Sequence, residues 1–226
     1  MGRTSTTTES VASRYTHFVY ITGADGTGKS TQARLLTQHL RDCGVRCRHL
    51  WLRFPFFFSL PLLAYARWRG YSWHEVCDGV RHGYWDFRYS RWLHTLLPWV
   101  LLLDATLVAI GKVYVPLRLG KTIVCERFVL DILVDLAVAF GDRSLHLRLP
   151  GKLYPRLVPR NAVICVLDLD AGTIRERRAD LRGDRCLEDR LSMFRCLSES
   201  LSLPLLSSGM PVVELSQCIH QRMNVR

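Results

Sequence analysis

Apolar residues occur in short runs bounded by glycine and charged residues, which is typical of strands buried on both faces of a sheet. Five runs are expected to be strands: residues 17–22, 46–53, 122–125, 162–169 and 212–215. Helical spacing predicts a helix over 29–42 that stops near Gly44, and an apolar helix over 128–140 that stops at Gly141. Strands that alternate with helices predict an α/β fold, with a five-stranded parallel sheet flanked by helices.

An aromatic segment, residues 51–99, interrupts this alternation and holds all six tryptophans of the chain. We expect helices there, lying over the carboxyl ends of the strands, where open α/β sheets bind ligands. The expected organisation is one domain over 17–226 with a helical insertion over about 54–101, after a disordered tail over 1–16. The tail lacks the apolar stretch of a secretory signal.

One apolar run, from Leu96 to Ile110, has to be weighed as a membrane span. It is about 15 residues long and contains Pro98 and Asp104, whereas a span needs roughly 20 apolar residues and disfavours a central carboxylate. A buried helix is therefore expected here, and no transmembrane span.

Composition and charge narrow the class of protein further. The chain of 226 residues is 48% apolar, which excludes a disordered, collagen-like or coiled-coil protein. It carries 31 Lys and Arg against 20 Asp and Glu, and this net charge of +11 favours nucleic acid, an acidic membrane surface or a phosphate-rich small molecule as partner. Eight cysteines without a C-x-x-C pair indicate reduced core residues of a cytoplasmic protein and argue against zinc.

The segment Gly23-Ala-Asp-Gly-Thr-Gly-Lys29-Ser30 follows a predicted strand and precedes a predicted helix. In this context G-x-x-x-x-G-K-S lets backbone N–H groups surround phosphate oxygens at the positive end of the helix. Lys29 is expected to reach the outer phosphates and Ser30 to bind Mg²⁺, so the motif predicts a nucleoside triphosphate site for ATP. The residues expected to contact ATP are Gly23, Ala24, Asp25, Gly26, Thr27, Gly28, Lys29, Ser30 and Thr31.

The loop and its neighbours, read as Gly-Ala-Asp25-Gly-Thr-Gly-Lys-Ser-Thr-Gln32, resemble the thymidylate kinase family, whose loop typically reads G-x-D-G-x-G-K-S-T-Q. Three other segments resemble family motifs: Leu52-Arg53-Phe54-Pro55, Cys125-Glu126-Arg127-Phe128, and Leu167-Asp168-Leu169-Asp170 before an arginine-rich stretch. The resemblance covers roughly residues 17–55, 102–135 and 162–215, although Glu126-Arg127 also fits deoxynucleoside kinases. It implies the P-loop NTPase three-layer fold.

The implied activity is transfer of the ATP γ-phosphate, with Mg²⁺, to a nucleoside monophosphate, most simply dTMP. Glu126 would hold Mg²⁺ together with Ser30. The alternative interpretation is that Glu126 is an ordinary carboxylate at the start of a helix. Arg127 would bind the acceptor phosphate as a catalytic residue beside Lys29, and its alternative is a structural ion pair. The resemblance further places Asp25 on the acceptor sugar, and Arg53 and Phe54 at the acceptor.

The stretch over about 171–187 is expected to form a lid, although most of its arginines also suit a solvated amphipathic helix. Some family members carry a catalytic arginine inside the loop, where this chain has Gly26. We therefore expect Arg182 and Arg185, which flank Gly183, to stabilise the transferring phosphoryl group. Asp131 either binds substrate or caps the helix after Arg127.

Two family positions that bind the acceptor phosphate are apolar here, namely Phe57 and Ala105. The sequence therefore leaves the identity of the phosphate acceptor open. The first alternative is a kinase of the same fold that acts on a nucleoside or another small metabolite. The second is an NTP-binding regulatory or nucleic-acid-associated protein, although no nucleic-acid module is recognisable and no stable nucleic-acid partner is expected. The family also implies a possible homodimer.

Overall fold

The computed structural model describes residues 17–53 and 57–224, and the predicted tail over 1–16 lies outside this part of the chain. Its centre is a five-stranded sheet in which all neighbouring strands run parallel. In spatial order the strands are β2 (Cys47–Trp51), β5 (Thr122–Glu126), β1 (Phe18–Gly23), β6 (Val163–Asp168) and β7 (Leu205–Ser207). The predicted α/β fold with a five-stranded parallel sheet is confirmed.

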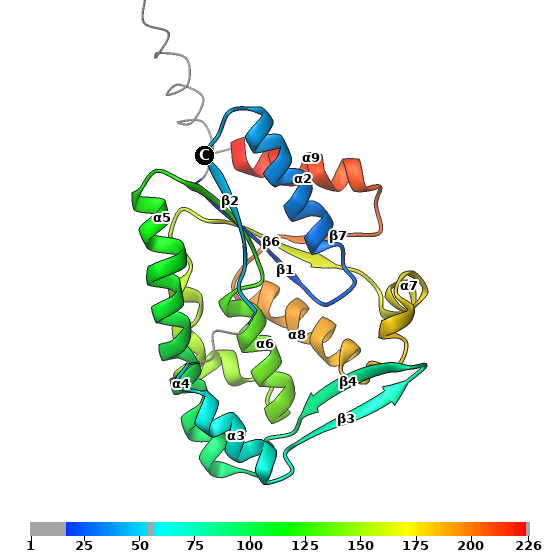
Figure 1. The fold of residues 1–226 in the computed structure, drawn as a ribbon. Coiled ribbons are helices and arrows are strands. Elements are labelled where there is room, and N and C mark those ends of the chain that lie inside the picture. Colours follow the sequence, from blue (N-terminus) through cyan, green and yellow to red (C-terminus); the bar gives the residue numbers. More distant parts are fainter. Residues whose placement is uncertain (1–16, 54–56, 225–226) are drawn as a thin grey trace, which may run out of the picture.

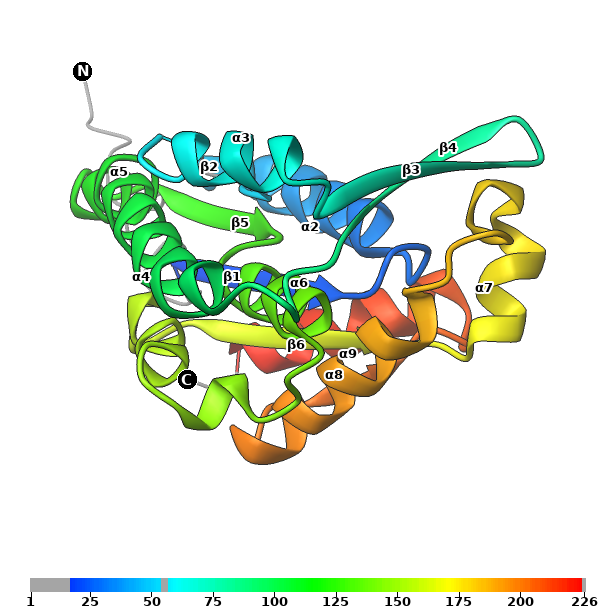
Figure 2. The ribbon, with the colours of Figure 1, turned by 90° about the horizontal axis from the view of Figure 1, so that it is seen from below.

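Helices cover both faces of the sheet because alternate side chains of each strand point to opposite sides. Phe18 and Tyr20 of β1 pack with the core that contains α4 (Arg91–Val108), α6 (Val129–Phe140) and α8 (Leu187–Ser200). Val19 and Ile21 pack with α2 (Lys29–Asp42) and α9 (Val212–Asn224) on the other face. Figures 1 and 2 show this three-layer arrangement, with α2 and α9 side by side.

The fifth strand was predicted at the wrong place. Residues 212–215 begin the helix α9, and the edge strand is instead the short β7. The apolar positions of α9 that are buried, Leu215, Ile219 and Met223, recur every four residues and pack against the sheet. A four-residue apolar run fits a strand or a helix equally well, so its type is decided by this longer spacing.

The insertion contains helix α3 (Leu60–Trp68) and then a β-hairpin, β3 (Ser72–Cys77) and β4 (Val80–Trp85), where only helices were expected. The Asp78-Gly79 pair forms the turn, and both residues have positive φ angles of 50° and 76°, as a tight hairpin requires. The hairpin extends toward the carboxyl ends of the strands and reaches the segment before α8, as Figure 2 shows.

Helix α4 continues through a π-helical turn, η1 (Ala109–Tyr114), into α5 (Val115–Arg118). Residues 91–118 thus form one helix that by length and composition could cross a membrane, and half of its apolar window is buried. The expected buried helix is therefore buried on one face only. Asp104 lies on that face and accepts hydrogen bonds from the backbone N–H groups of Phe57, Phe58 and Ser59 at the start of α3.

The remaining elements are short. They are η2 (Leu145–Leu147), η3 (Gly151–Leu153), η4 (Pro155–Leu157), α7 (Ala171–Arg177) and η5 (Ala179–Leu181).

All eight cysteines lie in the described residues and are free, as expected. Only Cys125 and Cys165 are buried, however, and Cys77 is exposed on the hairpin.

Candidate functional site

The glycine loop, residues 23–28, joins β1 to α2 beside the carboxyl end of β5. The connections that leave β1 and β5 run to opposite sides of the sheet, and such a reversal creates a crevice where α/β proteins bind ligands. Gly23 has a φ of +138°, and a Cβ atom there would lie 2.2 Å from the Leu167 carbonyl oxygen. Only glycine therefore lets the loop leave the sheet this close to β6.

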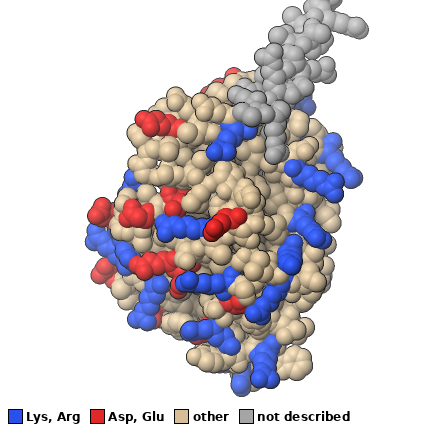
Figure 3. Space-filling view, turned by 180° about the vertical axis from the view of Figure 1, so that it is seen from behind, with Lys and Arg blue, Asp and Glu red and all other residues tan. Residues whose placement is uncertain are grey.

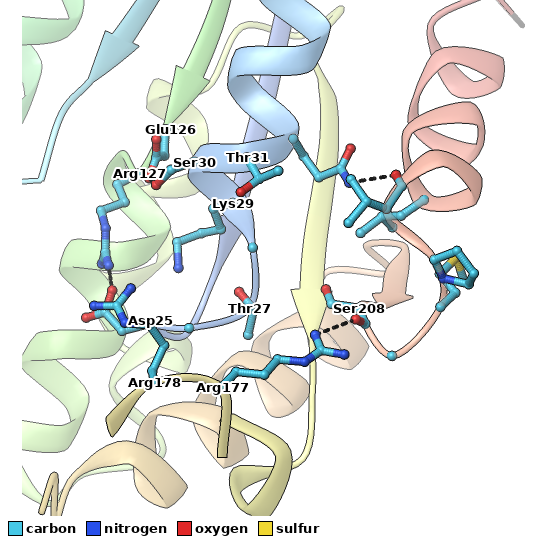
Figure 4. A pocket seen from close by; sticks show the side chains of 18 residues that line it. Asp25, Thr27, Lys29, Ser30, Thr31, Glu126, Arg127, Arg177, Arg178 and Ser208 are labelled. Carbon is cyan, nitrogen blue, oxygen red and sulfur yellow. Dashed lines mark hydrogen bonds and ion pairs between the residues drawn. The ribbon is translucent and has the colours of Figure 1, made fainter. Parts of the chain in front are cut away.

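The start of α2 is an open positive helix end. Its N-cap residue is Gly28, which offers no side chain to the first backbone N–H groups, and the first turn contains no acidic residue. A pocket of about 580 Å³ lies over this helix end (Figure 4). It is lined by residues 25–32, Glu126, Arg127, Arg177, Arg178, residues 208–212 and Leu215.

Lys29 is a buried cation at the bottom of this pocket. Its side chain is only 3% exposed, and its Nζ donates a hydrogen bond to the carbonyl oxygen of Ala24. Burial lowers the pKa of Lys29 to about 8, although the charges of Asp131 and Glu126 act in the opposite direction. A desolvated ammonium group beside an uncapped helix end is suited to receive an anion.

Ser30 and Glu126, the residues expected to hold Mg²⁺, are in direct contact. The Ser30 hydroxyl donates to Oε1 of Glu126 at 2.5 Å, and Oε2 of Glu126 lies 3.5 Å from Nε2 of His49. No cluster of three or more His, Cys, Asp or Glu side chains suited to a metal occurs in the described residues. A hydroxyl and one carboxylate nevertheless fit Mg²⁺, which usually keeps several waters and takes other ligands from substrate phosphates.

Arg127 and Asp25, which both line the pocket, form an ion pair (Figure 4). Arg53 also reaches Asp25, with 3.5 Å between Nη2 and Oδ2. Arg127 follows β5 with a φ of +60°, a conformation that costs energy for a residue with a Cβ atom. The structural ion pair named as the alternative for Arg127 is thus present, and Arg127 lines the pocket as well. Phe54 lies outside the described residues.

Asp131 has the capping role that was the alternative to substrate binding. Its Oδ2 accepts hydrogen bonds from the backbone N–H of Phe128, from Tyr20 Oη at 2.7 Å and from Thr22 Oγ1 at 2.9 Å. Burial raises the pKa of Asp131, an effect that the positive charges of Arg127 and Lys29 partly offset. Asp131 is only 2% exposed and is absent from the pocket lining, so it fixes the start of α6 from below.

Neither Arg182 nor Arg185, the expected lid arginines, lines the pocket. Arg185 forms an ion pair of 3.0 Å with Glu75 on the hairpin, and Nε of Arg182 turns back to the carbonyl of Arg175. Arg177 and Arg178 line the pocket instead, because α7 ends at Arg177 on the side that faces the glycine loop.

Sequence reasoning also missed the wall formed by residues 208–212. Nη1 of Arg177 donates to the carbonyl of Ser208 at 3.1 Å, and Nε2 of Gln32 donates to the carbonyl of Val212 at 3.0 Å. Met210 and Pro211 add apolar side chains to this wall. Ser208 of the same wall lies across the pocket from Arg127 in Figure 4. Gly209-Met210-Pro211 is typical of a turn. Because residues 212–215 were predicted to be a strand, the sequence did not indicate that this turn leads into α9 beside the pocket.

The two apolar positions that departed from the family pattern supply no cation here. Phe57 is 59% exposed, and Ala105 is fully buried against the core. Three arginines of the insertion, Arg81, Arg88 and Arg91, do not line the pocket either, and Arg88 is bound to Asp86 at 2.7 Å. In the described residues, Arg53 and Arg127 are the arginines that form ion pairs with Asp25.

No protein-family model matches the chain. A search of curated proteins likewise finds no significant match.

Proposed function

We propose that the protein is a P-loop phosphotransferase that binds Mg²⁺ and ATP at the glycine loop. The observation that carries this proposal is the pocket itself, in which an uncapped helix end and the buried Lys29 meet Arg127, Arg177 and Arg178. Four cations and one helix end around about 580 Å³ suit a polyphosphate. The apolar wall at Met210 and Pro211 suits the base of the nucleotide.

Phosphoryl transfer requires positioning and charge neutralisation more than covalent chemistry from the protein. In the proposed reaction an oxygen of the acceptor forms a bond to the γ-phosphorus, and the bond from that phosphorus to the β–γ bridging oxygen breaks, releasing ADP. Lys29 and the N–H groups of the loop bind the β- and γ-phosphates, while Arg177 and Arg178 stabilise the equatorial oxygens. Ser30 and Glu126 would bind Mg²⁺, which neutralises charge on the phosphate oxygens.

The leading acceptor is a nucleoside monophosphate, with dTMP as the resemblance to thymidylate kinases implies. The Asp25–Arg127–Arg53 cluster supports a phosphate acceptor, because an incoming phosphate can take over the guanidinium groups that now bind one carboxylate. A nucleoside or another small metabolite is the second candidate. It is favoured by the exposure of Phe57 and the burial of Ala105, which leave two family phosphate contacts without a cation.

The test is ADP release from Mg·ATP with a panel of nucleoside monophosphates, nucleosides and other hydroxyl acceptors. We expect dTMP-dependent turnover, reduced about 100-fold or more by Lys29→Ala and by Arg127→Ala. Arg182→Ala is the matched control, because this arginine lies outside the pocket, and its turnover should stay within about threefold of the wild type. Turnover with another acceptor alone would select the second candidate. A failure of ATP to bind would contradict the whole proposal.

A further inference from the structure

One face of the molecule is not used by the proposed function. Along α4 and η1 the exposed side chains are Trp92, Leu96, Trp99, Leu103, Leu107 and Ile110. Their spacing of three or four residues places them in one stripe, about 27 Å long. The other side of the same helix, with Leu93, Leu97 and Leu101, is buried in the core. The helix is thus apolar all round but covered on one side only.

The stripe is widened by its neighbours at both ends. Helix α3 contacts α4 and exposes Leu60, Tyr65 and Trp68, of which Trp68 is 80% exposed. Val115 and Leu119 are exposed where the long helix ends. We call these residues, with the stripe, the aromatic face. Contiguous apolar surface of this extent marks a binding surface on a folded protein.

Exposed charge within the two segments that form the aromatic face, residues 57–69 and 91–121, has one sign. No Asp or Glu occurs between Asp42 and Glu75, and between residues 87 and 125 the only acid is Asp104, which is fully buried. Exposed cations border the face: Arg67, Arg69, Arg91, Lys112, Arg118 and Lys121. In Figure 3 the side on which α4 and α5 lie shows Lys and Arg but no Asp or Glu.

We propose that the aromatic face docks the protein on an anionic lipid membrane, with α4 lying in the plane of the interface. Trp and Tyr favour the headgroup level of a bilayer, and the bordering Arg and Lys side chains complement lipid phosphates. An exposed apolar stripe whose own segments expose cations and no carboxylate is what an interfacial helix requires. This proposal does not depend on the phosphate chemistry at the glycine loop.

The long helix lies on the membrane and does not cross it. Crossing would expose Leu93, Leu97 and Leu101 to lipid and remove them from the core that holds α6. It would also break the hydrogen bond from Tyr154 Oη to the Pro98 carbonyl and uncover the Asp104 carboxylate that caps α3. The folded domain therefore presents one side of the helix and retains the other.

A lipid surface fits the face better than a second copy of the chain does. In a two-fold symmetric dimer the same patch meets itself, so the two rims of Arg and Lys would face each other without carboxylates to pair with. Lipid phosphates supply the missing negative charge. Burial of the apolar side chains would favour either occupant, whereas the charge pattern favours the lipid surface over a second copy of the chain.

The experiment is flotation of the whole protein with vesicles of phosphatidylcholine alone or of phosphatidylcholine and phosphatidylglycerol in equal parts. We expect binding to the anionic vesicles that weakens with added salt, and little binding to the neutral ones. The double variant Trp99→Ser, Leu103→Ser should bind about tenfold less. A matched control, Leu35→Ser with Val213→Ser, removes exposed apolar residues from α2 and α9 and should bind like the wild type.

We expect both double variants to be folded, because the substituted positions are exposed, and circular dichroism with thermal unfolding checks this. Lys29→Ala should keep full vesicle binding, which separates this proposal from the kinase proposal. Absence of vesicle binding contradicts the proposal. If sedimentation velocity then shows a dimer that the Trp99→Ser, Leu103→Ser variant dissociates, the occupant of the aromatic face is a second copy.

Discussion

At the scale of single residues, Lys29 shows a conflict between binding and stability. Its ammonium group is 3% exposed and has a pKa lowered to about 8 by burial. In the unfolded chain the same group has the usual value of 10.5. The folded protein therefore holds a poorly solvated charge at neutral pH, and a bound polyphosphate would compensate for the lost solvation.

Replacement of Lys29 by Met should consequently stabilise the protein without nucleotide. We expect the free energy of unfolding in urea to rise by roughly 1–3 kcal/mol at pH 7, while ATP binding is lost. Between pH 8 and 10.5 the folded wild-type protein binds fewer protons than the unfolded chain, so its free energy of unfolding rises with pH. The difference in stability between Lys29→Met and the wild type therefore becomes smaller across that window. Lys152→Met, at an exposed lysine, should change stability by less than about 0.5 kcal/mol. A less stable Lys29→Met protein would contradict the argument.

Arg127 combines a positive φ with a guanidinium group in the pocket, and two substitutions separate these properties. Arg127→Gly and Arg127→Ala both remove the charge, so both should lower turnover about 100-fold or more. Only glycine relieves the φ of +60°, so the Gly variant should be more stable than the Ala variant by about 1 kcal/mol in urea unfolding. Equal stability of the two variants would show that the backbone is not strained there.

At the scale of elements, the glycine loop and the arginine-rich segment (residues 171–187) pack directly on each other. Gly26 lies against Ile174 of α7 and Leu181 of η5. A Cβ atom at this position would come within 2.7 Å of Ile174 Cγ2. The loop position at which some thymidylate kinases carry an arginine is therefore closed here by the neighbouring helix.

Gly26→Ala and Gly28→Ala form a matched pair that measures this contact. Both glycines have a φ of +85°, but a Cβ atom at Gly28 would meet nothing within 4 Å. Gly28→Ala should cost about 1 kcal/mol of unfolding free energy, from the backbone alone. Gly26→Ala should cost about 1–3 kcal/mol more, because Ile174 must shift. Equal losses in denaturant unfolding would mean that α7 moves away freely.

The elements that the sequence predicted well are those with long periodic patterns. The helix over 29–42 matches α2, and the strands containing Val19, Val124 and Cys165 were found because each is apolar on both faces. β7 has only three residues and leaves no such pattern. Ser30 and Glu126 could be paired because Ser30 lies in the first turn of α2, directly after the glycine loop, and Glu126 ends β5. The pocket arginines depend instead on where α7 ends, which local sequence does not determine.

At the scale of the whole molecule, the hairpin of the insertion connects to the arginine-rich segment. Tyr84 Oη donates to the Gly183 carbonyl at 3.1 Å and accepts from the backbone N–H of Arg185 at 3.2 Å. Glu75 adds the ion pair with Arg185. The arginine-rich segment is thus held from the glycine loop on one side and from the hairpin on the other.

Tyr84→Phe should loosen the second of these attachments. We expect backbone hydrogen exchange over residues 179–187 to become faster by about a factor of five. The reason is that two hydrogen bonds, together worth about 1 kcal/mol, are lost. Exchange in the sheet should be unchanged. Tyr89→Phe is the control, because Tyr89 is 79% exposed and has no hydrogen bond to this segment in the described structure. Unchanged exchange in Tyr84→Phe would mean that the hairpin does not hold the segment.

The placement of the six tryptophans has a practical consequence for anyone who follows this protein by optical spectroscopy. All of them lie within residues 51–99, and each is between 36% and 80% exposed. Indole emission shifts only when its surroundings change from apolar to aqueous, and these rings already meet water in the native state. Intrinsic fluorescence therefore reports mainly on the insertion, which holds five of these rings, whereas Trp51 ends the sheet strand β2. Because all six rings are already exposed, melting of the sheet gives little fluorescence signal, so unfolding around the glycine loop is followed by far-ultraviolet circular dichroism instead.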